Sequence, residues 1–203
     1  MKTITITGLD GTGKTTYSKF LQSKLPNTSI VSVWDIIINP EYKVWSIYQY
    51  PPNVEQYVMN LTPASRSLFI FHAFNEAYQR AIQSQADYLI FDSHWYKYWA
   101  IEQAMGAPKH LGQFLSTQYK HADITFCLEL SIEEVLQRKK TISLYESGNK
   151  NKVDVNNFIK IQQSAQKIIR DILPNDTLYI YTAENIESIQ QMIWKQIQKQ
   201  FNL

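Results

Sequence analysis

The stretch GLDGTGKTT, residues 8–16, constrains the fold of this chain more than any other part of its sequence. It satisfies the pattern G-x-x-x-x-G-K-[ST]. KTITIT precedes it, a short run of β-branched residues typical of a strand, and a helical pattern begins at Lys14. A glycine-rich loop between a strand and a helix is the context in which this pattern binds phosphate, so we expect a phosphate-binding loop (P-loop) here.

The residue types in this loop suit a nucleoside triphosphate. Glycines allow main-chain N–H groups to approach phosphate oxygens without obstruction by a Cβ, and the start of the helix adds the positive end of its dipole. Lys14 is expected to reach the β- and γ-phosphates, and Thr15 to offer its hydroxyl to Mg²⁺. The residues expected to bind the nucleotide are Gly8, Gly11, Thr12, Gly13, Lys14, Thr15 and Thr16. The alternative, a turn that binds nothing, is disfavoured by the complete motif in its required context.

Strand-like and helix-like segments alternate along the rest of the chain. Five short apolar runs predict strands at 2–7, 29–33, 87–92, 123–130 and 177–182. Helical patterns cover 14–25, 63–84, 132–140, 155–172 and 186–201. This order predicts an α/β fold with a five-stranded, mainly parallel sheet and helices on both faces. Residues 35–62 are rich in Trp, Tyr and Pro without a clear period, and we expect an irregular wall or lid there.

Composition narrows the classes of protein further. A chain of 203 residues with 44% hydrophobic residues is most simply one domain, 1–203. Its net charge of +2 favours neither nucleic acid nor an anionic membrane as a partner. A single cysteine, Cys127, lies in an apolar run, and no apolar segment approaches the length of a membrane span. We therefore expect a cytoplasmic protein with a reduced, structural thiol.

Three stretches, ITITGLDGTGKTT, YLIFDSHWYKYWAIEQ and ADITFCLELSIEEVLQRKK, together resemble the thymidylate kinase family of nucleoside monophosphate kinases. The resemblance extends from residue 1 to about residue 173, although only the P-loop is a sharp motif. It implies a P-loop kinase fold, ATP as the phosphoryl donor with Mg²⁺, and a small-molecule acceptor, a nucleoside monophosphate with a thymidylate-like one favoured. It also implies a lid over about 138–153 and a homodimer.

Two acidic residues match family positions. Asp10 stands where the family keeps a carboxylate that faces the acceptor and the metal; its alternative is turn chemistry. Asp92 ends the predicted strand at 87–92, where an acid can hold Mg²⁺ through water or orient the acceptor; its alternative is a strand-end cap. Ser93 follows where the family has an arginine, which removes a phosphate-binding residue. Lys97 is the preferred replacement for it, ahead of His94 and Arg66, although it can equally be a solvated surface residue.

The resemblance also suggests where the acceptor base and the adenine bind. Phe71 matches an aromatic residue that stacks on the acceptor base, and Asn75 stands at the position of an arginine that reads the base edge. A purely structural alternative places Phe71 in the helix core. After the last strand, Thr182 and Ala183 occupy the position of the loop that contacts adenine.

The expected lid contains a basic stretch, LQRKKTISLYESGNKNKVD. Charge delivered from a lid can speed phosphoryl transfer by roughly a thousandfold, and Arg138 is our candidate for that role. The other lysines of the stretch can instead form a solvated face. With Lys14, Asp10 and Asp92, Arg138 completes the expected catalytic set.

Two other functions stay open because Ser93 and Asn75 depart from the family pattern. One is a regulatory or degenerate nucleotide-binding protein with little kinase activity. The other is a kinase for a non-nucleotide small molecule. A GTPase or helicase is less favoured because the chain is short and lacks an Asn-Lys-x-Asp signature, and a metal hydrolase because its histidines lack metal-ligand spacing.

Overall fold

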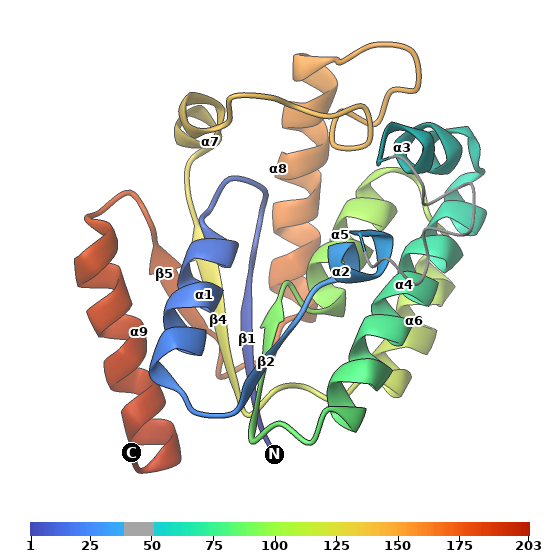
Figure 1. Ribbon diagram of the computed structural model, residues 1–203. Helices are drawn as coiled ribbons and strands as arrows, with labels where there is room; N and C mark the ends of the chain where they lie inside the picture. The colour runs from blue at the N-terminus through green and yellow to red at the C-terminus, as the bar shows by residue number, and fades with distance from the viewer. Residues whose placement is uncertain (39–50) are drawn as a thin grey trace.

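A parallel five-stranded sheet forms the centre of the computed structural model, which describes residues 1–38 and 51–203 (Figure 1). The strands are β1 (Lys2–Gly8), β2 (Thr28–Val31), β3 (Tyr88–Asp92), β4 (Ile124–Glu129) and β5 (Leu178–Tyr181). Their spatial order is β2-β3-β1-β4-β5, and every pairing is parallel. The predicted α/β fold with five strands is confirmed. Because all strands run the same way, their carboxyl ends meet at one edge of the sheet.

Helices cover both faces of the sheet, as the sequence predicted (Figure 1). Alternate residues of β1 point to opposite faces, and Ile4 and Ile6 pack with residues of α1 (Lys14–Lys24) and α9 (Ile186–Phe201). The opposite face is covered by α4 (Pro63–Gln83), α5 (Trp95–Ala104) and α8 (Val155–Ile172), which contribute to a second buried cluster. Strands buried on both faces explain their nearly continuous apolar sequence.

Several helix starts are fixed by side-chain caps that the sequence supplies. In α7 (Ile132–Arg138) the Ser131 hydroxyl accepts from the Glu134 N–H, and the Glu134 carboxylate accepts from the Ser131 N–H, which is a capping box. Thr62 caps α4 just before Pro63, and Asp154 and Asn185 cap α8 and α9. These caps explain why the predicted and observed starts of these helices agree.

The prediction of an irregular segment at 35–62 was wrong for its described part. Two helices lie in or overlap it, α2 (Val33–Ile38) and α3 (Pro51–Asn60), while residues 39–50 lie outside the described residues. The sequence reading also missed α5 and α6 (Lys109–Gln118). Seven of the ten residues of α5 are buried, so that helix shows no polar face and no helical period. In the described part of the chain, no helix combines the length and apolarity needed to span a bilayer.

Candidate active site

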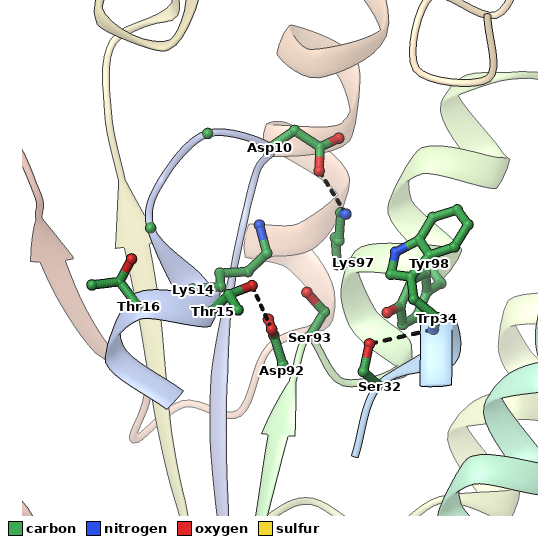
Figure 2. A pocket seen from close by; sticks show the side chains of 12 residues that line it. Asp10, Lys14, Thr15, Thr16, Ser32, Trp34, Asp92, Ser93, Lys97 and Tyr98 are labelled. Atoms are coloured by element: carbon green, nitrogen blue, oxygen red, sulfur yellow. Dashed lines mark hydrogen bonds and ion pairs between the residues drawn. The ribbon is translucent and has the colours of Figure 1, made fainter. Parts of the chain in front are cut away.

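The P-loop lines a cavity of about 340 Å³ at the carboxyl edge of the sheet (Figure 2). Three elements besides the P-loop contribute to it: the chain after β2, the end of β3, and α5. The lining residues are Asp10, Gly11, Gly13, Lys14, Thr15, Thr16, Ser32, Trp34, Asp92, Ser93, Lys97 and Tyr98. The structure therefore brings most of the predicted nucleotide-binding residues together with Asp10, Asp92 and Lys97. Gly8 and Thr12 do not line this cavity, and both are buried.

Two glycines of the loop adopt backbone conformations that other residues rarely tolerate. Gly8 has φ +133°, and a Cβ on it would overlap the carbonyl oxygen of Leu128 on the neighbouring strand. Gly13 has φ +92° and is the N-cap of α1, so the first main-chain N–H groups of that helix follow directly after it. The sequence thus produces the tight strand-to-helix turn that an anion-binding loop requires.

Lys14 is buried at the start of α1, and its Nζ donates to the main-chain oxygen of Leu9 at 2.6 Å. Burial, together with the nearby charge of Lys97, lowers the pKa of Lys14 to about 8. Asp10 and Asp92 offset this shift only in part, and an incoming polyphosphate would add negative charge beside the ammonium. The side chain is therefore electrostatically prepared for an anionic ligand.

Thr15 and Asp92 meet at the centre of the cavity. The Thr15 hydroxyl donates to Asp92 Oδ2 at 2.6 Å, which Figure 2 marks with a dashed line. A hydroxyl and a carboxylate beside a phosphate site are the oxygen donors that Mg²⁺ prefers, with phosphate oxygens and water completing its shell. These two residues fit a magnesium ion, and the Mg²⁺ site expected from the sequence stays a prediction.

Asp10 and Lys97 form an ion pair of 2.6 Å between Oδ1 and Nζ, with both side chains mostly buried. The other Asp10 oxygen accepts from Nε2 of Gln162 on α8 at 3.3 Å. Burial alone would raise the pKa of Asp10, but Lys97 and Lys14 hold it well below its usual range. Burial alone would lower the pKa of Lys97, but Asp10 raises it above its usual range. Both groups are therefore charged at neutral pH.

No arginine of this chain lines the P-loop cavity in the described structure. The sequence contains four arginines. Arg66 is buried and donates to Glu102 at 2.9 Å, Arg138 donates to the Thr182 oxygen at 2.6 Å, and Arg170 pairs with Glu129. Arg80 pairs with Glu76 in the C-terminal half of α4.

Ser93 stands where the resemblance to thymidylate kinases leads us to expect an arginine. It has φ +70° and is buried against β1, where its N–H donates to the Ile6 oxygen. His94 is enclosed by Phe91, Phe74 and Tyr96, and burial, with a smaller contribution from His121, lowers its pKa to about 3. Of the three predicted replacements for the arginine, Lys97 is the one that the structure places in the cavity.

A second cavity of about 600 Å³ adjoins the first and shares Asp10, Trp34 and Lys97 with it. Its other walls come from α3, α4 and the chain after α7. The remaining lining residues are Val54, Glu55, Val58, Ile70, Lys139, Thr141, Ile142, Ser143, Tyr145 and Glu146. This cavity has the size and the largely apolar walls of a small-molecule site with a few polar groups.

The expected lid, 138–153, crosses above the sheet from α7 toward α3 and returns to α8 (Figure 1). Lys139 pairs with Glu146 at 2.7 Å within it. The Tyr145 N–H donates to Glu55 of α3 at 2.9 Å, and its hydroxyl donates to the buried Glu102 at 2.8 Å. Arg138 points to Thr182, beside the expected adenine loop, and not to the P-loop cavity. Of the cations expected in the lid, Lys139 is the one that lines the second cavity.

The expected adenine loop lies beside the P-loop. The Thr182 hydroxyl donates to the Thr12 oxygen at 3.2 Å, and its N–H donates to the oxygen of Glu129 at the end of β4. Ala183 follows and is exposed. The structure therefore groups Thr12, Thr182, Ala183 and Arg138 on the β4–β5 side of the P-loop.

Phe71 and Asn75 line neither of the two joined cavities. They line a separate cavity of about 290 Å³ between α4 and α6, together with Leu111, Leu115 and Tyr119. Phe71 is buried in the core, and Asn75 Oδ1 accepts from the Tyr119 hydroxyl at 3.3 Å. The helix α4 turns this face away from the two joined cavities and presents Ile70 to them instead. The expected roles of Phe71 in base stacking and of Asn75 in base reading therefore have no support from their positions.

Sequence reasoning missed several residues of the joined cavities, notably Trp34, Tyr98 and Glu55. Tyr145, with Glu146, resembles a lid pair of the thymidylate kinase family, but the sequence assigned it no contacts. A signal existed for Trp34, because it follows a strand at the carboxyl edge of a parallel sheet, where ligands collect. For Glu55 we find none, because its position depends on the packing of α3 against the expected lid.

Comparisons by sequence found no relatives: no family model matches the chain, and no curated protein does either. Comparisons by structure found many. Thymidylate kinase from Candida albicans matches with a TM-score of 0.70 and 18% identity, over 98% of this chain and 91% of that one. Deoxyadenosine kinase from M. mycoides matches with a TM-score of 0.68 and 14% identity, over 97% and 99%. Thymidylate kinase from Ehrlichia chaffeensis matches with a TM-score of 0.62 and 17% identity, over 97% and 98%.

The chain has the fold of the P-loop kinases. The resemblance to thymidylate kinases that the sequence indicated is confirmed at the level of the fold. At 12–18% identity, these neighbours establish the fold alone, and the chemistry must be argued from this chain's own residues.

Proposed function

We propose that this protein transfers the γ-phosphoryl group of Mg·ATP to a nucleoside monophosphate. The observation that carries this proposal is the pair of adjoining cavities, one built on the P-loop and one on α3 and α4, which share Asp10, Trp34 and Lys97. A donor in the first cavity and an acceptor in the second would meet at these shared residues. Positioning and charge neutralisation are the main sources of catalysis in such a transfer.

In this proposal the donor lies along the P-loop. The main-chain N–H groups of Gly11, Gly13 and the start of α1 bind its phosphates, and Lys14 leaves the Leu9 oxygen to bind the β- and γ-phosphates. Thr15 and Asp92 would hold Mg²⁺, which would neutralise charge on the phosphates. Thr182 and Ala183 flank the adenine, and Arg138 supports this side of the site instead of acting on the transferred group.

Lys97 holds the phosphate of the acceptor in this proposal, in place of the missing arginine. An ammonium has three N–H donors, and Asp10 accepts from one of them, so Lys97 can keep Asp10 and still bind a phosphate oxygen. Asp10, held by Gln162 as well, orients the ammonium at the junction of the two cavities.

The thymidylate-like acceptor that the resemblance favours is one possibility within this proposal. Its base would occupy the second cavity, between Trp34, Ile70 and Tyr145, and not the side of α4 that carries Phe71 and Asn75. By the same resemblance we expect a homodimer and a lid role for 138–153. From length and composition we expect one domain and a cytoplasmic location.

A nucleoside acceptor is a second candidate, and one observation favours it. All four arginines are engaged outside the joined cavities, and both Lys97 and Lys139 already have carboxylate partners. A site with its charges balanced suits an acceptor without a phosphate. A deoxyadenosine kinase, solved with products dCMP and a flexible dCDP bound, is among the proteins with a similar fold, which supports including nucleosides in the acceptor panel.

A coupled assay for ADP release tests the proposal. We expect Mg·ATP turnover that depends on an added acceptor, drawn from a panel of nucleoside monophosphates and the matching nucleosides, and that is lost in Lys14→Ala. Higher kcat/KM with monophosphates supports the first candidate, and higher kcat/KM with nucleosides supports the second. Tight Mg·ATP binding without any acceptor-dependent ADP release would contradict both and would favour a nucleotide-binding protein without kinase activity.

A further inference from the structure

In the second cavity, one carboxylate oxygen of Glu55 accepts no hydrogen bond from any described residue. Three carboxylates line this cavity: Asp10, Glu55 and Glu146. Asp10 is bound through one oxygen by Lys97 and through the other by Gln162, and Glu146 is bound by Lys139 and by the Ser143 N–H. Glu55 accepts from the Tyr145 N–H with Oε1, and no described residue binds its Oε2.

The position of Glu55 separates it from the phosphate end of the site. It lines the second cavity but not the P-loop cavity, whereas Asp10, Trp34 and Lys97 line both. An acceptor that reaches toward the P-loop with its reacting end therefore leaves its other end near Glu55. For a nucleoside or a nucleotide, that other end is the base.

Aromatic and apolar side chains shape this end of the cavity for a flat ring. Trp34 lies at the junction with the P-loop cavity and is 48% exposed, so part of its side chain can contact a ring that extends from there toward Glu55. Tyr145 is held at both ends, because its N–H donates to Glu55 and its hydroxyl donates to Glu102. Glu102 is itself fixed by Arg66 and Ser67, so the Tyr145 ring has a rigid support.

The polar groups around Glu55 then determine whether a base that binds there must present hydrogen-bond donors or acceptors on its edge. An ionised carboxylate only accepts hydrogen bonds, so Glu55 needs a donor on the ligand. No amide or guanidinium side chain lines the described cavity, and its two ammonium groups, on Lys97 and Lys139, are each paired with a carboxylate, Asp10 and Glu146. The Tyr145 hydroxyl donates to Glu102, and the hydroxyls of Thr141 and Ser143 can donate or accept and therefore favour neither kind of edge.

We propose that Glu55 makes the acceptor site selective for a base with an exocyclic amino group, such as cytosine, adenine or guanine, over thymine or uracil. This inference rests on the proposed function, because it takes the second cavity as the acceptor site. The amino group donates to the open oxygen of Glu55. Thymine has a carbonyl oxygen where cytosine has its amino group, and its single N3–H donor is flanked by two carbonyl oxygens, so a carboxylate placed for the amino group meets a repulsive carbonyl oxygen. A single well-placed contact of this kind is worth about tenfold in discrimination, with a wide range.

Binding, measured by calorimetry, tests the inference without any need for turnover. The acceptor panel is dCMP, dAMP, dGMP and dTMP, followed by the four matching nucleosides, because the base contact does not depend on the phosphate. We expect at least one amino-bearing member to bind about tenfold or more tightly than its thymine counterpart in both series. Equal or tighter binding of thymine in either series would overturn the inference.

The variant Glu55→Gln sharpens the test. Its amide oxygen can still accept from the Tyr145 N–H, while its amide N–H₂ replaces the open acceptor by a donor. The preference for the amino-bearing base should therefore fall by about tenfold or reverse. Glu187→Gln, which removes the same charge from the exposed start of α9, should leave it unchanged. If Glu55→Gln keeps the wild-type preference, Glu55 only anchors Tyr145 and the inference is wrong.

Failure of the proposed kinase activity and failure of the proposed base selection give different results. If the nucleotides bind with the expected preference but no ADP is released, the proposed kinase activity fails while the base selection stands. If ADP is released most efficiently with thymidine or dTMP, the kinase proposal stands and the base selection fails. If Glu55→Gln does not fold, the wild-type panel alone decides.

Discussion

The donor side and the acceptor side of this site are built in different ways. The donor side is one continuous segment, residues 8–16, completed by Asp92 from the neighbouring strand. Besides the shared Asp10 and Lys97, the acceptor side is assembled from four segments: the chain after β2, α3, α4 and the expected lid. The first is specified locally by glycines and a helix start, whereas the second exists only when distant segments pack together. Changes on the donor side should therefore remove function, while changes on the acceptor side should redirect it.

The largest effect is expected from Lys14→Ala. This change removes the buried ammonium of the P-loop, and with it the charge that binds the β- and γ-phosphates. We expect kcat/KM for Mg·ATP to fall on the order of a thousandfold, the scale of a lost charge stabiliser in phosphoryl transfer. Steady-state ADP release measures it, and thermal unfolding shows whether the variant is folded. Activity within a fewfold of wild type would contradict the claim that changes on the donor side remove function.

A smaller and more selective effect is expected from Lys97→Met. If Lys97 binds the acceptor phosphate, KM for the monophosphate should rise by roughly tenfold to a hundredfold, while KM for ATP changes less. The change also leaves Asp10 buried without its cation, so the free energy of unfolding should fall by about 2–4 kcal/mol.

Two control variants separate these effects. Lys97→Arg keeps the charge and should retain most of the activity, and Lys195→Met, on the exposed face of α9, should behave as wild type. If the KM of the matching nucleoside rises in Lys97→Met as much as that of the monophosphate, Lys97 does not bind the acceptor phosphate.

The pH dependence of Mg·ATP binding provides a third comparison. The pKa of Lys14 is lowered to about 8, so above that pH the free protein loses the proton that phosphate binding requires. Affinity should be nearly constant below the pKa of Lys14 and should fall by about tenfold between pH 7 and pH 9, with a proton taken up on binding at the higher pH. Calorimetry in buffers of different ionisation enthalpy detects that proton. The dependence should be absent in Lys14→Arg, because a guanidinium stays protonated over this range, and its persistence there would assign it to another group.

The fold and the donor side could be predicted from the sequence because their determinants are local. Apolar strands, helix caps such as Ser131 with Glu134, and the P-loop motif each carry their structure in a few neighbouring residues. The acceptor side could not be predicted from the sequence in this way. Phe71 matched a family position in sequence, but α4 presents Ile70 to the cavity, and nothing local shows which face of a mostly apolar helix will meet a ligand. Helix α5 was missed for a related reason, since it is buried on nearly all sides.

The smallest effect is expected from Asn75→Ala. Asn75 is exposed and lies in the α4–α6 cavity, where it accepts a hydrogen bond from Tyr119. Its loss should change kcat/KM for any acceptor by less than about twofold and the free energy of unfolding by about 1 kcal/mol or less. A strong change in acceptor preference would restore the base-reading role suggested by the sequence. It would also show that the acceptor binds on the other side of α4.

The most direct test of the central claim, that the loop at residues 8–16 binds the triphosphate of a nucleotide, is a calorimetric titration of the intact protein with Mg·ATP at neutral pH. We predict saturable heat with one site per chain, and loss of that heat in Lys14→Ala under the same conditions. The absence of heat with the wild-type protein, or equal binding by the variant, would contradict the claim and, with it, the proposed function.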